Sequence, residues 1–350
     1  MGYEITIEPI GQSLTVREGQ TVLDACLRAG VWLPHACGHG LCATCKVQLV
    51  EGEVDHGDAS NFALMDFERD EGKLLACCAT AQSDLVIEAD IDEDLDARYL
   101  PLQDFSATVV EARMLTPTIR GLWLEPDRPV EFQAGQYVML HVPGIGERAF
   151  SIASAPGERR IELHVRKVDG GAATTWLHEQ LMPDHRLNFT APFGRFFVRK
   201  SADIPIVLVA GGSGLSSPKS MLLDLLDDGC ELPITLFHGA RNLEELYYRE
   251  RFESLVSKHA NFTYVPVLSA SDREGWSGET GYVQEALRRR FANDFRGHKA
   301  YLCGPPPMIE ACIATLMQGR LFEQDIHTER FFTASDAGAP ARRSPLFKNI

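Results

Sequence analysis

The stretch ACGHGLCATC, residues 36–45, holds three cysteines in a C-x4-C-x2-C array, and a fourth cysteine follows in LLACCAT, residues 74–80. Plant-type [2Fe–2S] clusters use this spacing. Glycines and other small residues separate the sulfurs, so backbone N–H groups can approach the cluster and stabilise its reduced form. The spacing therefore predicts a one-electron carrier bound by Cys37, Cys42, Cys45 and Cys77.

Other uses of these cysteines fit less well. A structural zinc site prefers two C-x2-C pairs, and only Cys42 and Cys45 form one. A Rieske centre replaces two of the cysteines by histidines, and the second, C-x2-H string is absent. A thioredoxin-like C-x-x-C has no extra cysteine upstream. The remaining cysteines Cys26, Cys78, Cys230 and Cys312 are predicted to be small buried hydrophobes, and His35 and His39 solvated loop residues.

Length and composition bound the class of protein. With 350 residues, 45% of them hydrophobic and 24% charged, the chain is expected to form two or three globular domains. No run of 18 apolar residues is present, so we expect no membrane association. The N-terminus lacks the apolar core of a signal peptide. Nine cysteines, four of them assigned to a metal, favour a reducing cytoplasm.

The net charge of −15 is unevenly distributed. Residues 1–100 hold 19 Asp and Glu against 6 Lys and Arg, a net −13, which leaves −2 for residues 101–350. The acidity either serves solubility or forms a docking face for a basic redox partner. It argues against nucleic-acid binding.

The pattern of apolar residues divides the chain. Residues 1–92 carry strand patterns and a short helix pattern, indicating a small α+β unit, and an acidic linker, 93–101, follows. Residues 102–200 alternate with period two, which is typical of an antiparallel barrel. Residues 203–332 alternate strand and helix, which indicates a parallel α/β domain. Residues 333–350 are expected to be a surface tail.

Two strings in the barrel suit a flavin nucleotide. In the first, Arg148 can hold a phosphate, Phe150 can stack on a flat ring and Ser151 can hydrogen-bond a ring nitrogen. The second opens a helix at Gly171 and Thr174, where amide groups can bind a pyrophosphate. The alternative for the first string alone is an ordinary strand with a surface arginine and a core phenylalanine.

Three strings in the α/β domain suit a nicotinamide dinucleotide. VAGGSGLSSP, residues 209–218, joins an apolar strand to a helix, but Ser217 replaces the third glycine of G-x-G-x-x-G. CGPPPM, residues 303–308, also ends a strand and opens a helix. HTERFF, residues 327–332, follows near the end. The predicted nicotinamide residues are Gly212, Ser213, Gly214, Arg241, Cys303, Gly304 and Pro305.

These motifs together resemble the ferredoxin–NADP reductase superfamily, and over nearly the whole chain they resemble the reductase components of soluble di-iron multicomponent monooxygenases, those of phenol hydroxylases most of all. The resemblance implies a β-grasp [2Fe–2S] ferredoxin domain, an antiparallel FAD-binding β-barrel and a Rossmann-like NAD-binding domain. It implies flavin contacts from Arg148, Phe150, Ser151, His164, Val165, Arg166, Gly171 and Thr174. Phe150 departs from the commoner tyrosine, which keeps ring stacking but loses a hydroxyl contact.

The resemblance also implies the reacting centre. Cys303 would lie beside the hydride-carrying carbon of the nicotinamide, and Glu329 and Phe331 would approach the flavin ring. We therefore predict Ser151, Cys303 and Glu329 as the catalytic residues. The alternative for Cys303 is a buried cysteine at the end of a strand, and the alternative for Glu329 is a solvated residue on an edge strand.

The implied activity carries electrons from NADH through FAD and the cluster to a di-iron hydroxylase that converts phenols to catechols. A flavin accepts a hydride and can release its two electrons singly. One alternative is a reductase of a toluene, alkene or methane monooxygenase or of an aromatic-ring dioxygenase. Another is a redox-sensing or electron-carrier module without turnover. Arg241, with no acidic residue at the ribose-reading position, could favour NADPH. The similar GARN string in relatives implies NADH, which we predict.

Overall fold

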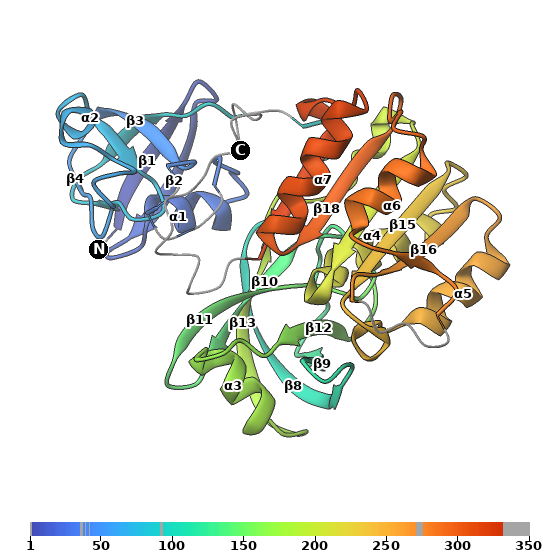
Figure 1. Cartoon of the computed structure of the whole chain (residues 1–350). Coiled ribbons are helices and arrows are strands. Elements are labelled where there is room, and N and C mark those ends of the chain that lie inside the picture. Colours follow the sequence, from blue (N-terminus) through green and yellow to red (C-terminus); the bar gives the residue numbers. More distant parts are fainter. Residues whose placement is uncertain are drawn as a thin grey trace. The chain divides into compact units, whose positions relative to one another are not determined.

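In the computed structural model, residues 2–35, 38, 40–41, 43–91, 94–270 and 276–331 are described. Predictions for Cys37, Cys42, His39 and the tail 333–350 lie outside these residues. The chain divides into two compact units, Met1–Gln103 and Asp104–Ile350 (Figure 1).

The first unit is a mixed sheet with a helix packed on it. Its strand order is β2-β1-β7-β3-β5, and β1 pairs with β7 in parallel. The elements are β1 (Gly2–Glu8), β2 (Gln12–Arg17), α1 (Val22–Arg28), β3 (Lys46–Glu51), α2 (Asp66–Asp70), β5 (Lys73–Leu75) and β7 (Leu85–Glu88), with a small pair β4 (Val54–Asp55) and β6 (Thr80–Ala81). Thr21 caps α1 by accepting from the Asp24 amide at 3.2 Å. Leu23, Cys26 and Leu27 of α1 are buried, which is the β-grasp arrangement predicted.

The second unit begins with a six-stranded antiparallel barrel. The strand order is β11-β10-β13-β8-β9-β12, and a bridge between Ile152 and Leu163 brings the two ends of the sheet together. The alternating side chains of these strands fill the interior, where Leu122, Val138 and Phe189 are fully buried. The elements are β8 (Gln103–Met114), β9 (Ile119–Pro126), β10 (Tyr137–Val142), β11 (Gly146–Ser151), β12 (Ile161–Arg166), α3 (Ala172–Glu179) and β13 (Arg186–Phe193).

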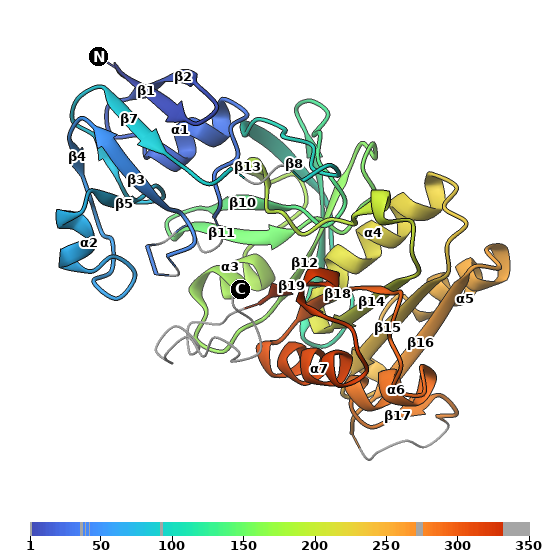
Figure 2. The same cartoon turned by 90° about the horizontal axis from the view of Figure 1, so that it is seen from above.

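A parallel sheet completes the second unit, in the order β17-β16-β15-β14-β18-β19. The strands are β14 (Ile206–Gly211), β15 (Ile234–Ala240), β16 (Phe262–Leu268), β17 (Glu279–Thr280), β18 (Lys299–Gly304) and β19 (Ile326–Arg330). Helices α4 (Ser216–Asp227) and α5 (Arg249–Lys258) cover one face, while α6 (Val283–Arg290) and α7 (Pro306–Gln318) cover the other (Figure 2).

The chain order of this sheet reverses between β14 and β18, which are neighbours. In open α/β sheets, ligands bind outside the carboxyl ends of the strands at such a reversal. The predicted nicotinamide turns after β14 and β18 both lie at this place. The fold class predicted from the sequence is confirmed.

The barrel and the parallel sheet share one apolar core. Ile119, Ala134 and Phe196 of the barrel region lie in the same buried cluster as Leu208 of β14 and Leu222 of α4. The two parts of the second unit therefore pack on each other directly, and residues of both can build one site.

Candidate electron-transfer site

The described part of the cysteine loop has the backbone that a tight wrap requires. Gly38 and Gly40 each have φ of +70°, and Ala43 has φ of +61°. A Cβ at Gly40 would lie 2.6 Å from the Cys78 Sγ and 3.2 Å from the Ala59 Cα. A side chain there would displace the segment that carries the fourth predicted ligand.

The two described ligand candidates come from adjacent segments. The Ala76 amide donates to the carbonyl oxygen of Cys45 at 2.9 Å, which ties the segment of Cys77 to the end of the loop. Cys45 is buried and Cys77 half-buried. Thiolates held this close to small-residue backbone suit an iron–sulfur cluster.

The prediction for the other cysteines is partly wrong. Cys26 and Cys312 are fully buried, and burial raises the pKa of each thiol to about 12. Cys78 and Cys230 are only half-buried. Cys78 adjoins Cys77 with 3.7 Å between the sulfurs, and both side chains are partly accessible.

At the nicotinamide end, Glu329 of β19 joins the predicted catalytic residues. Its Oε2 accepts from Ser217 Oγ at 2.6 Å, from Ser151 Oγ at 3.0 Å and from Cys303 Sγ at 3.4 Å. These partners come from the barrel, from α4 and from β18. Glu329 is therefore not a solvated edge residue, and a single carboxylate links three elements.

The environment of this carboxylate favours its protonated form. Burial raises the pKa of Glu329, and the hydrogen bonds from Ser217, Ser151 and Cys303 oppose this only in part. Burial likewise raises the pKa of Cys303, so its thiol stays protonated and can donate. The carboxyl group can therefore hold a proton, and Ser151, Ser217 and Cys303 fix its orientation.

The predicted flavin residues occupy two strands that meet and a helix start. Ser151 ends β11, whose continuation bridges β12 at Leu163. Arg148 is exposed, and Phe150 packs against the edge of the barrel core. Gly171 precedes α3, whose first turn has no side-chain cap. Its amide groups are thus available for a phosphate, and these residues fit a flavin dinucleotide.

The three strand residues 164–166 face different surroundings. Both ring nitrogens of His164 are engaged, Nε2 with Glu162 and Nδ1 with Tyr247. Val165 belongs to the barrel core. The half-buried Arg166 lies against the nicotinamide turn, because a Cβ at Gly212 would be 2.6 Å from its Nη1.

The glycine turn after β14 needs glycine for close packing. Gly212 has φ of +59°, and a Cβ at Gly214 would lie 2.6 Å from the carbonyl oxygen of Cys303 and from the Gly304 Cα. Pro305 precedes α7, which starts without a side-chain cap. Arg241 is exposed just beyond the end of β15. The turn after β14 therefore lies directly on the end of β18, as a dinucleotide site requires.

Residue patterns alone missed part of this site. Ser217 stood out only as a missing glycine, yet it makes the shortest of the three hydrogen bonds to Glu329. Glu162, Lys219 and Tyr247 form a buried polar cluster beside the turn. The available signal was a charged residue at an inward position of an apolar strand, IELHVR, and of an apolar helix, SSPKSMLLDLL.

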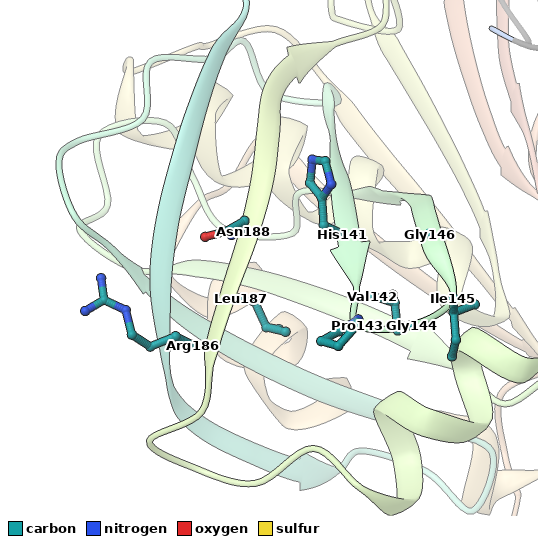
Figure 3. Close-up of a pocket in the computed structure, with 9 residues that line it drawn as sticks. All are labelled: His141, Val142, Pro143, Gly144, Ile145, Gly146, Arg186, Leu187 and Asn188. Carbon is teal, nitrogen blue, oxygen red and sulfur yellow. The ribbon is translucent and has the colours of Figure 1, made fainter.

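A hollow of about 390 Å³ lies elsewhere on the barrel (Figure 3). Residues 141–146 and 186–188 line it, from the turn between β10 and β11 and from β13. None of the predicted site residues is among them. In the described part of the chain, no helix is long and apolar enough to cross a membrane.

Family models match three successive parts of the chain. The 2Fe-2S iron-sulfur cluster binding domain matches residues 5–82, the oxidoreductase FAD-binding domain residues 107–198, and the oxidoreductase NAD-binding domain residues 208–313. These are the predicted cofactor classes in the predicted order.

Similar proteins match over the full length. The phenol hydroxylase P5 protein of Acinetobacter pittii is 59% identical and the phenol 2-monooxygenase reductase component DmpP of a Pseudomonas species 57% identical, each over all of both chains. Among solved structures, the Amycolatopsis cytochrome P450 reductase GcoB has a TM-score of 0.85 at 35% identity, covering 94% of this chain and 98% of that one.

The three domains and the full-length relatives agree. The chain is an oxidoreductase with [2Fe–2S], FAD and NAD domains, and it belongs to the family of iron–sulfur flavoprotein reductases that includes the reductase components of phenol hydroxylases.

Proposed function

We propose that this chain is the NADH-dependent reductase of a multicomponent phenol hydroxylase and delivers single electrons to a di-iron hydroxylase that converts phenols to catechols. The observation that carries the proposal is full-length identity of 57–59% with the phenol hydroxylase P5 protein and the phenol 2-monooxygenase reductase component DmpP. When bound, FAD would accept the hydride and the iron–sulfur cluster would transfer single electrons. The chain supplies their binding and orientation.

In this proposal Ser151, Cys303 and Glu329 form the reacting centre. Their convergence on one carboxylate oxygen supports it. Ser151 would hydrogen-bond the flavin ring, Cys303 would position the nicotinamide against it, and Glu329 would hold a proton near the ring. The remaining flavin residues bind the nucleotide, and residues 212–214 and 303–305 bind the nicotinamide dinucleotide.

The acceptor is proposed to dock on the first unit near the cysteine loop. Phe62 is 95% exposed and Leu41 60% exposed, and the Ser60 amide donates to the carbonyl of Gly40 within that loop. Exposed acidic residues Asp58 and Asp66 flank the same segment. An apolar patch with an acidic border suits a partner of opposite charge. We also propose a cytoplasmic location, where cysteines stay reduced.

Three measurements test the function. The purified protein should show flavin and iron–sulfur absorption, oxidise NADH faster than NADPH, and support phenol hydroxylation when combined with a di-iron hydroxylase. Cys42→Ser should abolish cytochrome c reduction while NADH–ferricyanide activity persists. Equal loss of both activities would contradict the proposed electron path, and support of a toluene or alkene oxidation system but not a phenol hydroxylase would reassign the partner.

A further inference from the structure

A buried polar cluster lies between β12 of the barrel and the helices α4 and α5, and apart from His164 the proposed function does not use its residues. The side chains of Lys219, Glu162 and His164 are 1%, 6% and 0% exposed. Tyr247, just before α5, is 5% exposed. Charged groups this far from water need dedicated partners.

These side chains and their partners form one continuous network of hydrogen bonds. Lys219 Nζ donates to Glu162 Oε2 at 2.8 Å and to the Ala153 carbonyl at 2.7 Å. Glu162 Oε1 accepts from Tyr248 at 2.6 Å and lies 2.7 Å from His164 Nε2. Because a carboxylate only accepts, that ring nitrogen carries the hydrogen, and Nδ1 of the neutral ring faces the other way as an acceptor.

Tyr247 extends this hydrogen-bond network to the proposed nicotinamide-binding turn. Its single hydroxyl hydrogen is shared between two acceptors, His164 Nδ1 at 3.0 Å and the carbonyl oxygen of Gly212 at 3.1 Å. The ring meets His164 edge-on at 5.2 Å and His238 edge-on at 5.6 Å. Burial lowers the pKa of both histidines, so neutral rings enclose the tyrosine and fix its plane.

The Gly212 carbonyl that Tyr247 contacts lies at the start of the turn on which the nicotinamide dinucleotide is proposed to bind. Gly212 opens the turn Gly212–Leu215, and Gly214 within it lies on the backbone of Cys303 and Gly304. Cys303 in turn donates to Glu329. A displacement of Gly212 would thus pass along a rigid turn to the reacting centre.

We propose that Tyr247 is a positioning residue for hydride transfer: its hydroxyl, oriented by His164, fixes the Gly212 carbonyl and sets the nicotinamide-binding turn against the flavin-binding strand. This rests on the proposed roles of the turn and of β12. Tyr247 transfers no proton, since the hydride passes from NADH to the flavin and NAD⁺ leaves. Its contribution is geometric, and a small misplacement of reacting groups slows a reaction strongly.

Tyr247→Phe tests this, because it removes the hydroxyl and keeps the ring. In the holoprotein, anaerobic stopped-flow reduction of the flavin by NADH should slow by about tenfold. With NADH deuterated at the transferred position, the isotope effect on turnover should rise, because hydride transfer becomes more rate-limiting. Bound flavin and iron should stay at wild-type levels.

Tyr264→Phe is the matched control. It removes the hydroxyl of a half-buried tyrosine of the same domain, which hydrogen-bonds His238 at 3.1 Å rather than the turn Gly212–Leu215. It should leave flavin reduction within about twofold of wild type. A second pair of variants tests the role of His164, which contacts the Tyr247 hydroxyl. His164→Asn keeps a polar atom for Tyr247 and should slow flavin reduction less than His164→Leu does.

The outcomes are distinguishable. Wild-type flavin reduction in Tyr247→Phe, with or without a lower melting temperature, would overturn the inference, as would equal slowing in Tyr264→Phe. A wild-type protein that NADH does not reduce would refute the proposed function and this inference with it. Slow reduction confined to Tyr247→Phe and His164→Leu is the result we expect.

Discussion

The Lys219 ammonium on α4 lies 2.8 Å from the Glu162 carboxylate on β12, and this pair joins the two halves of the second unit out of reach of water. Burial by itself would raise the pKa of Glu162, but the hydrogen bonds from His164 and Lys219 and the charge of Lys219 outweigh it and lower the pKa. The carboxylate is therefore ionised at neutral pH. Because both charges are desolvated, each depends on the other.

We predict that Lys219→Met destabilises the protein by about 3–5 kcal/mol, since it leaves a buried carboxylate without its cation. Denaturant unfolding of the holoprotein measures this. Lys167→Met is the control: Lys167 also lies 2.7 Å from a carboxylate, that of Glu179, but the two side chains are 46% and 55% exposed. Its loss should cost under about 1 kcal/mol.

A double variant checks the origin of the loss. Lys219→Met with Glu162→Leu removes both charges and should recover much of the stability lost in the single variant, because no unpaired buried charge remains. A double variant less stable than Lys219→Met would show that the attraction within the pair outweighs its desolvation. Similar losses in Lys219→Met and Lys167→Met would contradict the burial argument.

We predict that Glu329→Gln has opposite effects on the stability of the protein and on its rate of flavin reduction. Since burial raises its pKa above the ordinary 4.5, the folded state binds this proton more tightly than the unfolded state. The associated stability is present below pH 4.5 and is lost as pH rises through the folded pKa. Glu329→Gln mimics the protonated form, so its stability relative to wild type should increase with pH above 4.5.

The same variant should reduce flavin by NADH more slowly, because the single oxygen of an amide accepts less well than the carboxylate that Ser151, Ser217 and Cys303 contact, and would orient the reacting centre less precisely. Melting temperatures across pH and stopped-flow rates measure the two effects. Glu323→Gln, on a short helix before β19 and with no resolved role in the site, is the control for both. A stability difference between Glu329→Gln and wild type that stays constant with pH would remove the assigned titration.

Local sequence predicted the features that depend on local backbone. The turn after β14 follows from an apolar strand, glycines and a helix pattern within about ten residues, and the structure has it there. The contacts of Lys219 were not predictable in this way. A lysine in a helix usually reaches solvent, and only packing of α4 on the barrel turns this one inward.

Contacts between residues far apart in the sequence explain the other features that the sequence did not predict. Ser217 meets Glu329 across 112 positions of sequence, and no spacing rule connects a residue on α4 with one on β19. Cys78 was expected to be buried because free cysteines usually are. The structure instead leaves Cys78 half-buried, like its neighbour Cys77, because the packing of this segment against the rest of the first unit covers the two side chains only in part.

Adjacent cysteines give a sharp test of the cluster assignment. Cys77→Ser should lose the cluster, seen as loss of iron and acid-labile sulfide, and cytochrome c reduction should fall to background while NADH–ferricyanide activity persists. Cys78→Ser should keep the cluster and both activities, since its sulfur is not at a predicted ligand position. Cluster loss in Cys78→Ser alone would exchange the two assignments.

The exposed Phe62 predicts where the acceptor binds. An aromatic side chain that is 95% exposed beside the cysteine loop gains most when a partner covers it. We expect Phe62→Ser to raise the apparent KM for the hydroxylase about tenfold, while flavin and cluster reduction by NADH stay unchanged. Leu95→Ser, at a residue 92% exposed, is the control and should leave that KM unaltered.

Salt separates the apolar and acidic parts of this surface. If Asp58 and Asp66 attract a basic partner, raising ionic strength should increase the KM for the hydroxylase in both wild type and Phe62→Ser. Because an apolar contact is little affected by screening, the ratio of the two KM values should stay constant across that range. If the KM of the wild-type protein does not change with ionic strength, solubility alone explains the acidity of the first unit. If Phe62→Ser has the same KM as wild type, the docking site does not include Phe62 and lies away from the cysteine loop.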